Sequence, residues 1–242
     1  MKSIASVGMA AARQIVWRLL AILALLAAVE LGLAAGSFAN GAGQAERVRF
    51  GTCLQQAGVW YVFGAALLAL TAVLCIQGSD FAGGRLRYTL RRLPMGEARV
   101  SLLWSLVLVG AYVVLWAFQV LVVLVCWRLY CRANGVAAPG FEFFVECYLD
   151  GFLHSLLPLA SWSRWIRNGL WFLALGCSTV VFGYRQRRGT IWPLPAVAAV
   201  LGWLFFTQGI TGSGTDLALS LVYVGLLAYC VYRVGWTYEE ES

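Results

Sequence analysis

Residues 102–127 read LLWSLVLVGAYVVLWAFQVLVVLVCW, an apolar run that contains no Asp, Glu, Lys or Arg. A helix needs about 20 mainly apolar residues to cross the hydrocarbon of a bilayer while its backbone hydrogen bonds are satisfied internally. This run is long enough to meet that requirement by itself. The sequence therefore predicts that residues 102–127 form a membrane-spanning helix near the middle of the chain.

The rest of the chain has the same character. Of its 242 residues, 61% are hydrophobic and only 12% are charged, which lies outside the range of a soluble domain of this size. Barrel strands would alternate apolar and polar residues over about 10 positions, whereas the apolar runs here are unbroken. We expect an all-α, polytopic membrane protein that forms a single transmembrane domain over residues 1–242. Its six predicted spans are 15–38, 59–77, 102–127, 165–184, 191–207 and 217–234.

Charge placement predicts the orientation and supports the weakest span, 165–184, whose apolar part is shortened by Arg167 and Asn168. Lys and Arg concentrate in the cytoplasmic loops of membrane helices. Six spans with both termini cytoplasmic place most of the 18 Lys and Arg residues inside, with Arg164 and Arg167 among those outside. Without the fourth span, the basic cluster 185–188 would lie outside. The expected location is the bacterial cytoplasmic membrane.

The segment 79–99, SDFAGGRLRYTLRRLPMGEAR, is the most strongly charged part of the chain and is predicted to be cytoplasmic. Leu86, Leu90 and Leu93 follow a helical i, i+4, i+7 spacing, and Pro94 ends the helix. Such an amphipathic helix suits either a groove on a cytoplasmic partner, whose carboxylates pair bidentately with Arg, or lipid headgroups. Its basic face consists of Arg85, Arg87, Arg91 and Arg92.

The order of a span, an Arg-rich helix ending in Leu-Pro and a second span, seen in RYTLRRLPM at 87–95, resembles the coupling region of ABC-2 type transporter permeases. Six spans with both ends cytoplasmic also match that family. The resemblance implies an exporter subunit that pairs with a second permease chain, in a homodimer or a heterodimer, and is driven by a separate ABC ATPase subunit. The implied ATPase-coupling residues are Arg85, Leu86, Arg87, Leu90, Arg91, Arg92, Leu93, Pro94 and Met95.

The external segment departs from part of that family. In its polysaccharide exporters and drug pumps the external elaboration lies before the last span, where this chain has only the connection 208–216. The long external segment here, 128–164, follows the third span. The cargo is therefore left open among a peptide, a drug-like molecule and an ion.

No motif for ATP hydrolysis is present, so the chain is not expected to be an enzyme. A P-loop needs G-x-x-x-x-G-K-[ST], and the sole lysine is Lys2. No cofactor is expected either. The net charge of +7 is not accompanied by a motif that reads nucleic acid, and we assign it to topology and to contact with anionic membrane lipids.

The external segment contains FEFFVECYLDGFLHSLL at 141–157, which predicts one amphipathic helix along the outer leaflet. Three alternatives remain for its polar stripe: a metal site, a solvated face with an Asp150 to His154 contact, or a gate over a translocation path. A disulfide between Cys131 and Cys147 is also left open. The polar stripe consists of Glu142, Glu146, Asp150 and His154.

Glu30 is the clearest charge inside a predicted span, and such charges are costly and tend to mark pathways or buried pairs. We group it with Glu146, Asp150 and His154 as a possible pathway or gate residue; the plainer alternative is that it pairs with a neighbour or lies at headgroup depth.

As an alternative to transport, the chain is a non-transporting scaffold or sensor subunit that recruits a partner through its basic cytoplasmic loop. An enzyme that uses the polar stripe is a third hypothesis.

Overall fold

The computed structural model describes residues 2–41, 48–77, 97–136, 139–159, 161–186, 192–206 and 213–239. Within these ranges every regular element is an α-helix and no strand occurs, which confirms the all-α class. The helices are α1 (Lys2–Gly41), α2 (Phe50–Gln56), α3 (Val59–Gln77), α5 (Glu97–Asn134), α6 (Pro139–Leu149), α7 (Gly151–Leu156), α8 (Trp162–Gln186), α9 (Leu194–Phe206) and α10 (Ser213–Glu239).

Five of these helices are long and apolar enough to cross a membrane, and they lie in α1, α3, α5, α8 and α10. A sixth apolar helix, α9, has 13 residues and therefore covers about 20 Å at 1.5 Å per residue, less than the roughly 30 Å of bilayer hydrocarbon. The chain is thus a helical, polytopic membrane protein. The candidate spans are Ile15–Ala39, Val59–Ile76, Val100–Asn134, Trp162–Gly183 and Gly214–Arg233.

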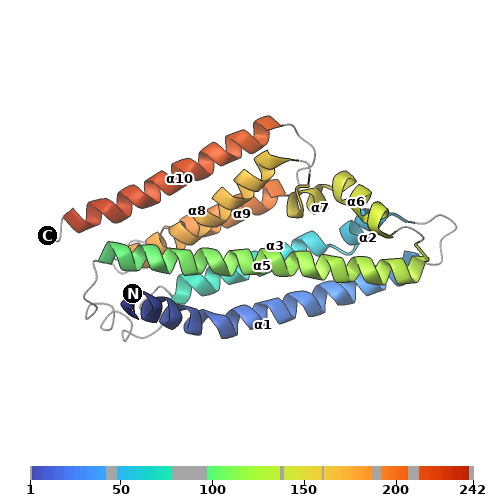
Figure 1. Ribbon diagram of the computed structural model, residues 1–242, viewed down its shortest axis with the longest axis horizontal. Helices are drawn as coiled ribbons and strands as arrows, with labels where there is room; N and C mark the ends of the chain where they lie inside the picture. Colours follow the sequence, from blue (N-terminus) through green and yellow to red (C-terminus); the bar gives the residue numbers. More distant parts are fainter. Residues whose placement is uncertain are drawn as a thin grey trace.

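The long helices lie side by side along a common direction (Figure 1). The beginning of α1, the end of α3, the beginning of α5 and the end of α10 all lie at the same end of this bundle. The short helices α2, α6 and α7 lie at the opposite end, and we call them the cap helices. The two helix ends that flank residues 78–96 in the sequence therefore lie at the end of the bundle opposite the cap helices.

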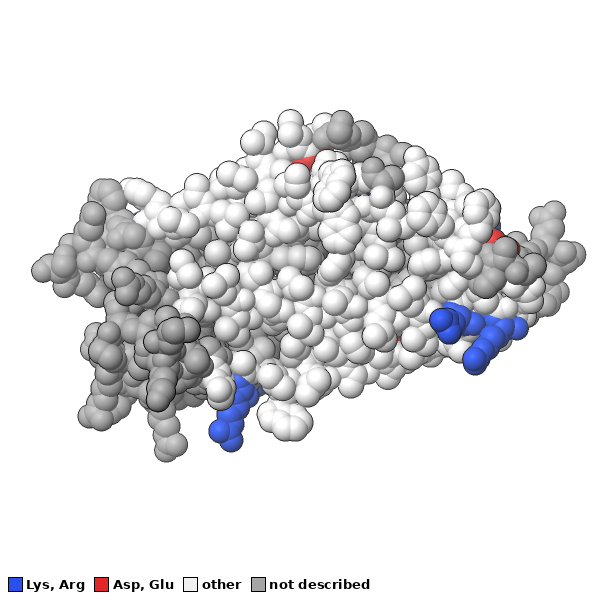
Figure 2. All heavy atoms as spheres, viewed as in Figure 1, with Lys and Arg blue, Asp and Glu red and all other residues white. Residues whose placement is uncertain are grey.

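The surface around the middle of the bundle is apolar. Large side chains such as Trp17, Leu121 and Leu221 are exposed along the long helices. In the view of Figure 2 the middle of the molecule shows mostly uncharged atoms, and the visible Lys and Arg atoms lie on either side of it. Exposed apolar surface of this extent is costly in water and suits a helical bundle surrounded by lipid.

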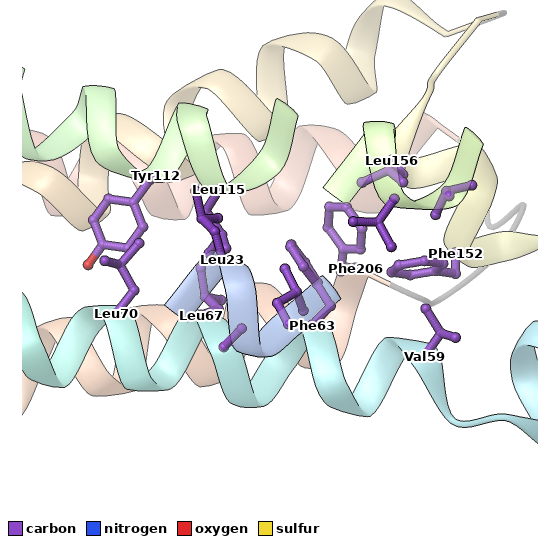
Figure 3. Close-up of a cluster of buried hydrophobic side chains, with 14 of the residues drawn as sticks. Leu23, Val59, Phe63, Leu67, Leu70, Tyr112, Leu115, Phe152, Leu156 and Phe206 are labelled. Carbon is purple, nitrogen blue, oxygen red and sulfur yellow. The ribbon is translucent and has the colours of Figure 1, made fainter. Parts of the chain in front are cut away.

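The interior is filled by apolar side chains from α1, α3 and α5 and, nearer the cap, by rings from α3, α7 and α9 (Figure 3). Tyr112 is the one labelled residue of this cluster that has a polar end, and its hydroxyl lies 3.1 Å from the Thr71 hydroxyl. Near the cap, the rings of Phe63, Phe152 and Phe206 contact one another at centroid distances of 5.6–6.0 Å. The cap helices therefore share one core with the bundle.

Two glycine–tryptophan contacts hold α9 between α3 and α8. A Cβ on Gly64 of α3 would overlap the indole of Trp203, and a Cβ on Gly202 of α9 would overlap the indole of Trp171. The Trp203 indole also donates a hydrogen bond to the carbonyl of Trp60 at 3.0 Å. Glycine lets the backbones approach closely, as is common between membrane helices.

The bounds of α3 coincide with the predicted span 59–77, whereas α1, α5 and α10 extend beyond the predicted spans 15–38, 102–127 and 217–234. The predicted fourth span, 165–184, becomes a helix from Trp162 to Gln186. Arg164, expected in the external segment 128–164, and Arg167, expected near the beginning of the span, both lie in the first turns of this helix and are buried. The prediction that the helix begins after Arg164 is wrong, because both charges are paired within the protein, as described below.

Candidate functional site

The segment predicted to be one external helix over 141–157 forms two short helices, α6 and α7. The break is at Asp150, whose backbone is extended, with φ of −93° and ψ of 126°. Its side chain accepts a hydrogen bond from the Leu153 backbone N–H at 2.9 Å, so it caps the beginning of α7. Aspartate competes well for this capping position, which explains why the helix does not continue.

Three residues of the polar stripe are buried, so the prediction of a solvated face is wrong for them. The residues Glu146, Asp150 and His154 are only 9%, 5% and 8% exposed, and Glu142 is half-buried. Buried polar groups need partners in order to offset the loss of hydration. The partners of the two carboxylates come from α2 and from the residue that precedes it.

Glu146 binds the beginning of α2. Its Oε1 lies 3.1 Å from Nε of Arg49, and its Oε2 accepts the Gly51 backbone N–H at 3.0 Å. The Arg49 side chain makes no capping hydrogen bond to the helix that follows it, so α6 supplies the carboxylate that satisfies this free N–H group. Anionic groups are favoured at this end of a helix.

Asp150 binds the other end of α2. Its Oδ2 accepts a hydrogen bond from Nε2 of Gln55 at 2.7 Å. A Cβ on Gly51 would lie 3.0 Å from the Cβ of Asp150, so the absence of a side chain at Gly51 permits this close approach. The two carboxylates therefore clamp α2 against the junction of α6 and α7.

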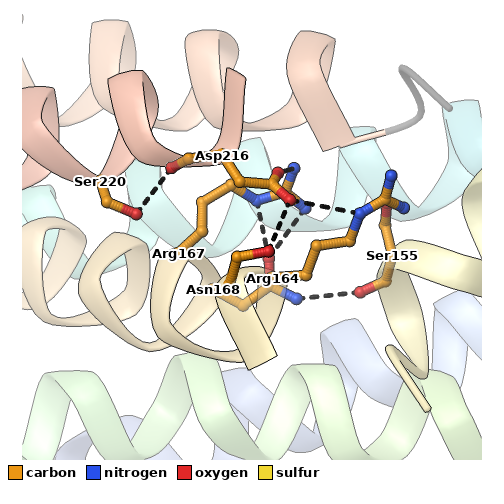
Figure 4. Close-up of polar contacts among 7 residues, drawn as sticks. Ser155, Arg164, Arg167, Asn168, Asp216 and Ser220 are labelled. Carbon is orange, nitrogen blue, oxygen red and sulfur yellow. Dashed lines mark hydrogen bonds and ion pairs between the residues drawn. The ribbon is translucent and has the colours of Figure 1, made fainter. Parts of the chain in front are cut away.

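A second group of charges lies between α8 and α10. Asp216, in the first turn of α10, faces Arg167 at 2.8 Å and Arg164 at 3.5 Å (Figure 4). The three side chains are 4–6% exposed. We call these three residues the buried ionic triad; it carries two positive charges and one negative charge.

Further hydrogen bonds connect the triad to α7. The amide of Asn168 donates to the Ser155 carbonyl at 2.9 Å, and Nη1 of Arg164 lies 3.4 Å from the Ser155 hydroxyl. The hydroxyl of Ser163 donates to Asp216 at 3.2 Å. The network thus joins one cap helix to two membrane-spanning helices. Charged groups removed from water are stable only when paired and hydrogen-bonded in this way.

His154 lies next to the triad, on α7. Burial lowers its pKa from the ordinary value of 6.5, and the nearby Arg164 and Arg167 lower it further, whereas a backbone hydrogen bond and Asp216 act in the opposite direction. Its ring meets the ring of Tyr148 edge-on at a centroid distance of 5.6 Å. The imidazole is therefore neutral at pH 7 in the folded protein.

This neutral histidine predicts a dependence of stability on pH. Above pH 6.5 the imidazole is neutral in both the folded and the unfolded chain. As the pH falls through 6.5, the unfolded chain takes up the proton first, so stability decreases until the folded pKa is passed. We expect a smaller fall in melting temperature between pH 7.5 and 5.5 for His154→Asn than for the unchanged protein. Equal falls would contradict this prediction.

Glu30 is not part of the cap network. Its carboxylate, on α1, accepts a hydrogen bond from Nε2 of Gln119 on α5 at 2.8 Å, and both residues are fully buried. Glu30 thus pairs with a neighbour, as one of the alternatives expected. The predicted coupling residues, Arg85 to Met95, lie outside the described residues.

The alternatives that involve metal or disulfide chemistry find no support in the described ranges. No group of three or more His, Cys, Asp or Glu side chains there is arranged to hold a metal ion. Cys131 and Cys147 do not form a disulfide bond with each other. Burial raises the pKa of Cys147 to about 12, with Asp150 and Glu146 adding to the shift, so this thiol stays protonated at neutral pH.

The arrangement joins the cap helices to one another and to α8 through buried polar contacts. The sequence identified Glu146 and Asp150 as candidate site residues but did not identify Arg49, Gln55 or Asp216. For Arg49 and Asp216, pairing with an opposite charge was the signal that the sequence offered.

Comparisons of the chain with models of protein families, with curated proteins and with solved structures found no match.

Proposed function

We propose that the chain is the permease subunit of an ABC-2 type transporter, with six membrane spans, both termini cytoplasmic and a separate ATPase subunit. The observation that carries this proposal is that the end of α3 and the beginning of α5, which flank residues 78–96 in the sequence, lie at the same end of the bundle as the beginning of α1 and the end of α10. In this topology α9 and its flanking residues form the fifth span. The Arg-rich sequence 85–95 is then the cytoplasmic coupling helix.

The described helices suit such a role mechanically. Residues 78–96 lie between α3 and α5 in the sequence, and α5 packs against α1 and α8. A push on this connection from an ATPase therefore acts on the centre of the bundle. At the far end, the cap helices and their carboxylates form the external gate, which opens when movement of α8 and α10 separates these helices.

The transporter works as a dimer of such chains in the bacterial cytoplasmic membrane and exports a peptide, a drug-like molecule or an ion.

The coupling role is tested by reversing two charges. We expect Arg91→Glu with Arg92→Glu to abolish co-purification of a P-loop ATPase, because like charges then face the carboxylates of its groove. The measurement is a mild-detergent purification of the tagged full-length chain from its native cells, with mass spectrometry and an ATPase assay. The loss should be at least tenfold relative to the unchanged protein.

A matched control uses the other basic cluster that this topology places in the cytoplasm. The double substitution Arg187→Glu and Arg188→Glu changes the net charge by the same amount and should leave the ATPase bound. Equal losses in both variants would indicate a general charge effect and contradict a coupling helix. Recovery of a partner without a nucleotide site would instead support the scaffold or sensor alternative.

A further inference from the structure

Glu30 and Gln119 form an isolated polar pair between α1 and α5. Both residues are 0% exposed, and a single hydrogen bond, from Nε2 of Gln119 to Oε2 of Glu30, joins them at 2.8 Å. The second oxygen of each side chain, Oε1, is buried and has no hydrogen-bond partner. The pair therefore contains two buried acceptor atoms that face no donor.

No cation lies on the neighbouring parts of the helices packed around this pair. Apart from Glu30, residues 19–41 of α1, all of α3 and residues 100–127 of α5 contain no Asp, Glu, Lys, Arg or His. Arg18 is twelve residues from Glu30 and Arg128 is nine from Gln119, which corresponds to about 18 Å and 14 Å along their helices.

Among the residues that the structure describes, the other elements supply no cation that acts on Glu30 either. The titratable group that interacts with Glu30 from α5 is the Cys126 thiol, which is no cation. The cap helix α2, which packs on α1, carries no charged side chain. On α8, which packs on α5, Arg164 and Arg167 are held by Asp216.

An ionised Glu30 would thus be a buried anion with one amide donor and no counter-charge, an arrangement that costs several kcal/mol. A protonated carboxyl group avoids this cost and gains an O–H donor. The two unpartnered oxygens then become complementary, because one carries the proton and the other accepts it. Carboxylic acids and primary amides commonly pair in this way, through two parallel hydrogen bonds in one ring.

We infer that Glu30 is a proton-binding site inside the membrane domain, in which Oε1 carries a proton and donates it to Oε1 of Gln119 while the existing amide bond is kept. Binding forms one O–H bond on the carboxylate and changes its charge from −1 to 0. No bond in the protein breaks. A sodium ion is a poorer occupant, since hard cations require about six oxygen ligands and this pair provides two free ones.

The test is infrared spectroscopy of the purified full-length protein in lipid nanodiscs at pH 7. A protonated carboxyl group has a carbonyl stretch that is separated from the bands of carboxylates and amides. We expect Glu30→Gln to remove such a band, while Glu142→Gln, the same substitution at a half-buried acid of the cap, leaves it in place. Loss of a carboxylate band with Glu30→Gln, or no change, would overturn the inference.

A second variant tests the hydrogen bond itself and does not depend on the folding of Glu30→Gln. Gln119→Leu removes the amide donor to Oε2, so the carbonyl band of Glu30 should shift to higher frequency. An unshifted band would overturn the paired geometry. The band should also be the same in sodium chloride and in choline chloride. Its disappearance in sodium chloride would show that a metal cation displaces the proton, which would overturn the inference.

Discussion

Asp216→Ala is expected to lower the free energy of unfolding by about 3–5 kcal/mol, because it leaves two buried guanidinium groups without a counter-charge. Arg167 and Arg164 lie 2.8 Å and 3.5 Å from this carboxylate, and none of the three side chains has appreciable access to water. The measurement is thermal unfolding of the purified protein in mild detergent, together with the yield of monodisperse protein. Ser220→Ala, which removes a bond only to the Asp216 backbone carbonyl, serves as the control.

The same pairing predicts a rescue. Replacement of the whole triad, by Arg164→Met, Arg167→Met and Asp216→Leu together, should restore most of the lost stability, because apolar side chains of similar volume often replace buried ion pairs without cost. If Asp216→Ala lowers stability by less than about 1 kcal/mol, or if the triple variant is worse than the single one, the triad does not hold α8 to α10.

Gly202→Ala is expected to have the second largest effect. The added methyl group would overlap the Trp171 indole, which also donates a hydrogen bond to the Ala198 carbonyl at 3.0 Å. Overpacking of this kind costs about 1–3 kcal/mol, more than the roughly 0.5–1 kcal/mol that alanine gains over glycine within a helix. The net result should be a lower melting temperature and weaker binding of α9.

The control for this substitution is Gly110→Ala on α5. A Cβ at that position meets nothing within 4 Å, so the change should be neutral or slightly stabilising. Combining Gly202→Ala with Trp171→Phe, which frees space for the methyl group, should recover part of the loss. Equal melting temperatures for Gly202→Ala and Gly110→Ala would contradict the packing argument.

The membrane helices could be predicted from the sequence because a spanning segment must be apolar over nearly its whole length. The prediction of 59–77 matches α3 at both ends. The fourth span was harder, since hydropathy treats Arg167 as a reason to end the helix. In the structure its charge is offset by Asp216, a partner 49 residues away, and a sliding window cannot register such a pairing.

The cap illustrates the same limit at shorter range. The spacing of Glu146, Asp150 and His154 was recognised, but periodicity alone predicts a continuous helix with one wet face. The local preference of Asp150 for an N-cap and the donors on α2 break that helix and bury its stripe. The sequence did contain one signal for the triad. Asp216 is the only Asp or Glu between positions 151 and 238, so it is the only acid in that range that could pair with Arg164 and Arg167.

The clamp on α2 has a consequence for biogenesis. Gly51 and Gln55 are each bound by a carboxylate that lies 95 residues later in the chain. At synthesis rates of 5–20 residues per second, about 5 to 20 s separate the emergence of α2 from that of its partners. During this interval the first helices enter the membrane with the donors of α2 still solvated. The cap end of the bundle is therefore completed late, only after Glu146 and Asp150 have been synthesised.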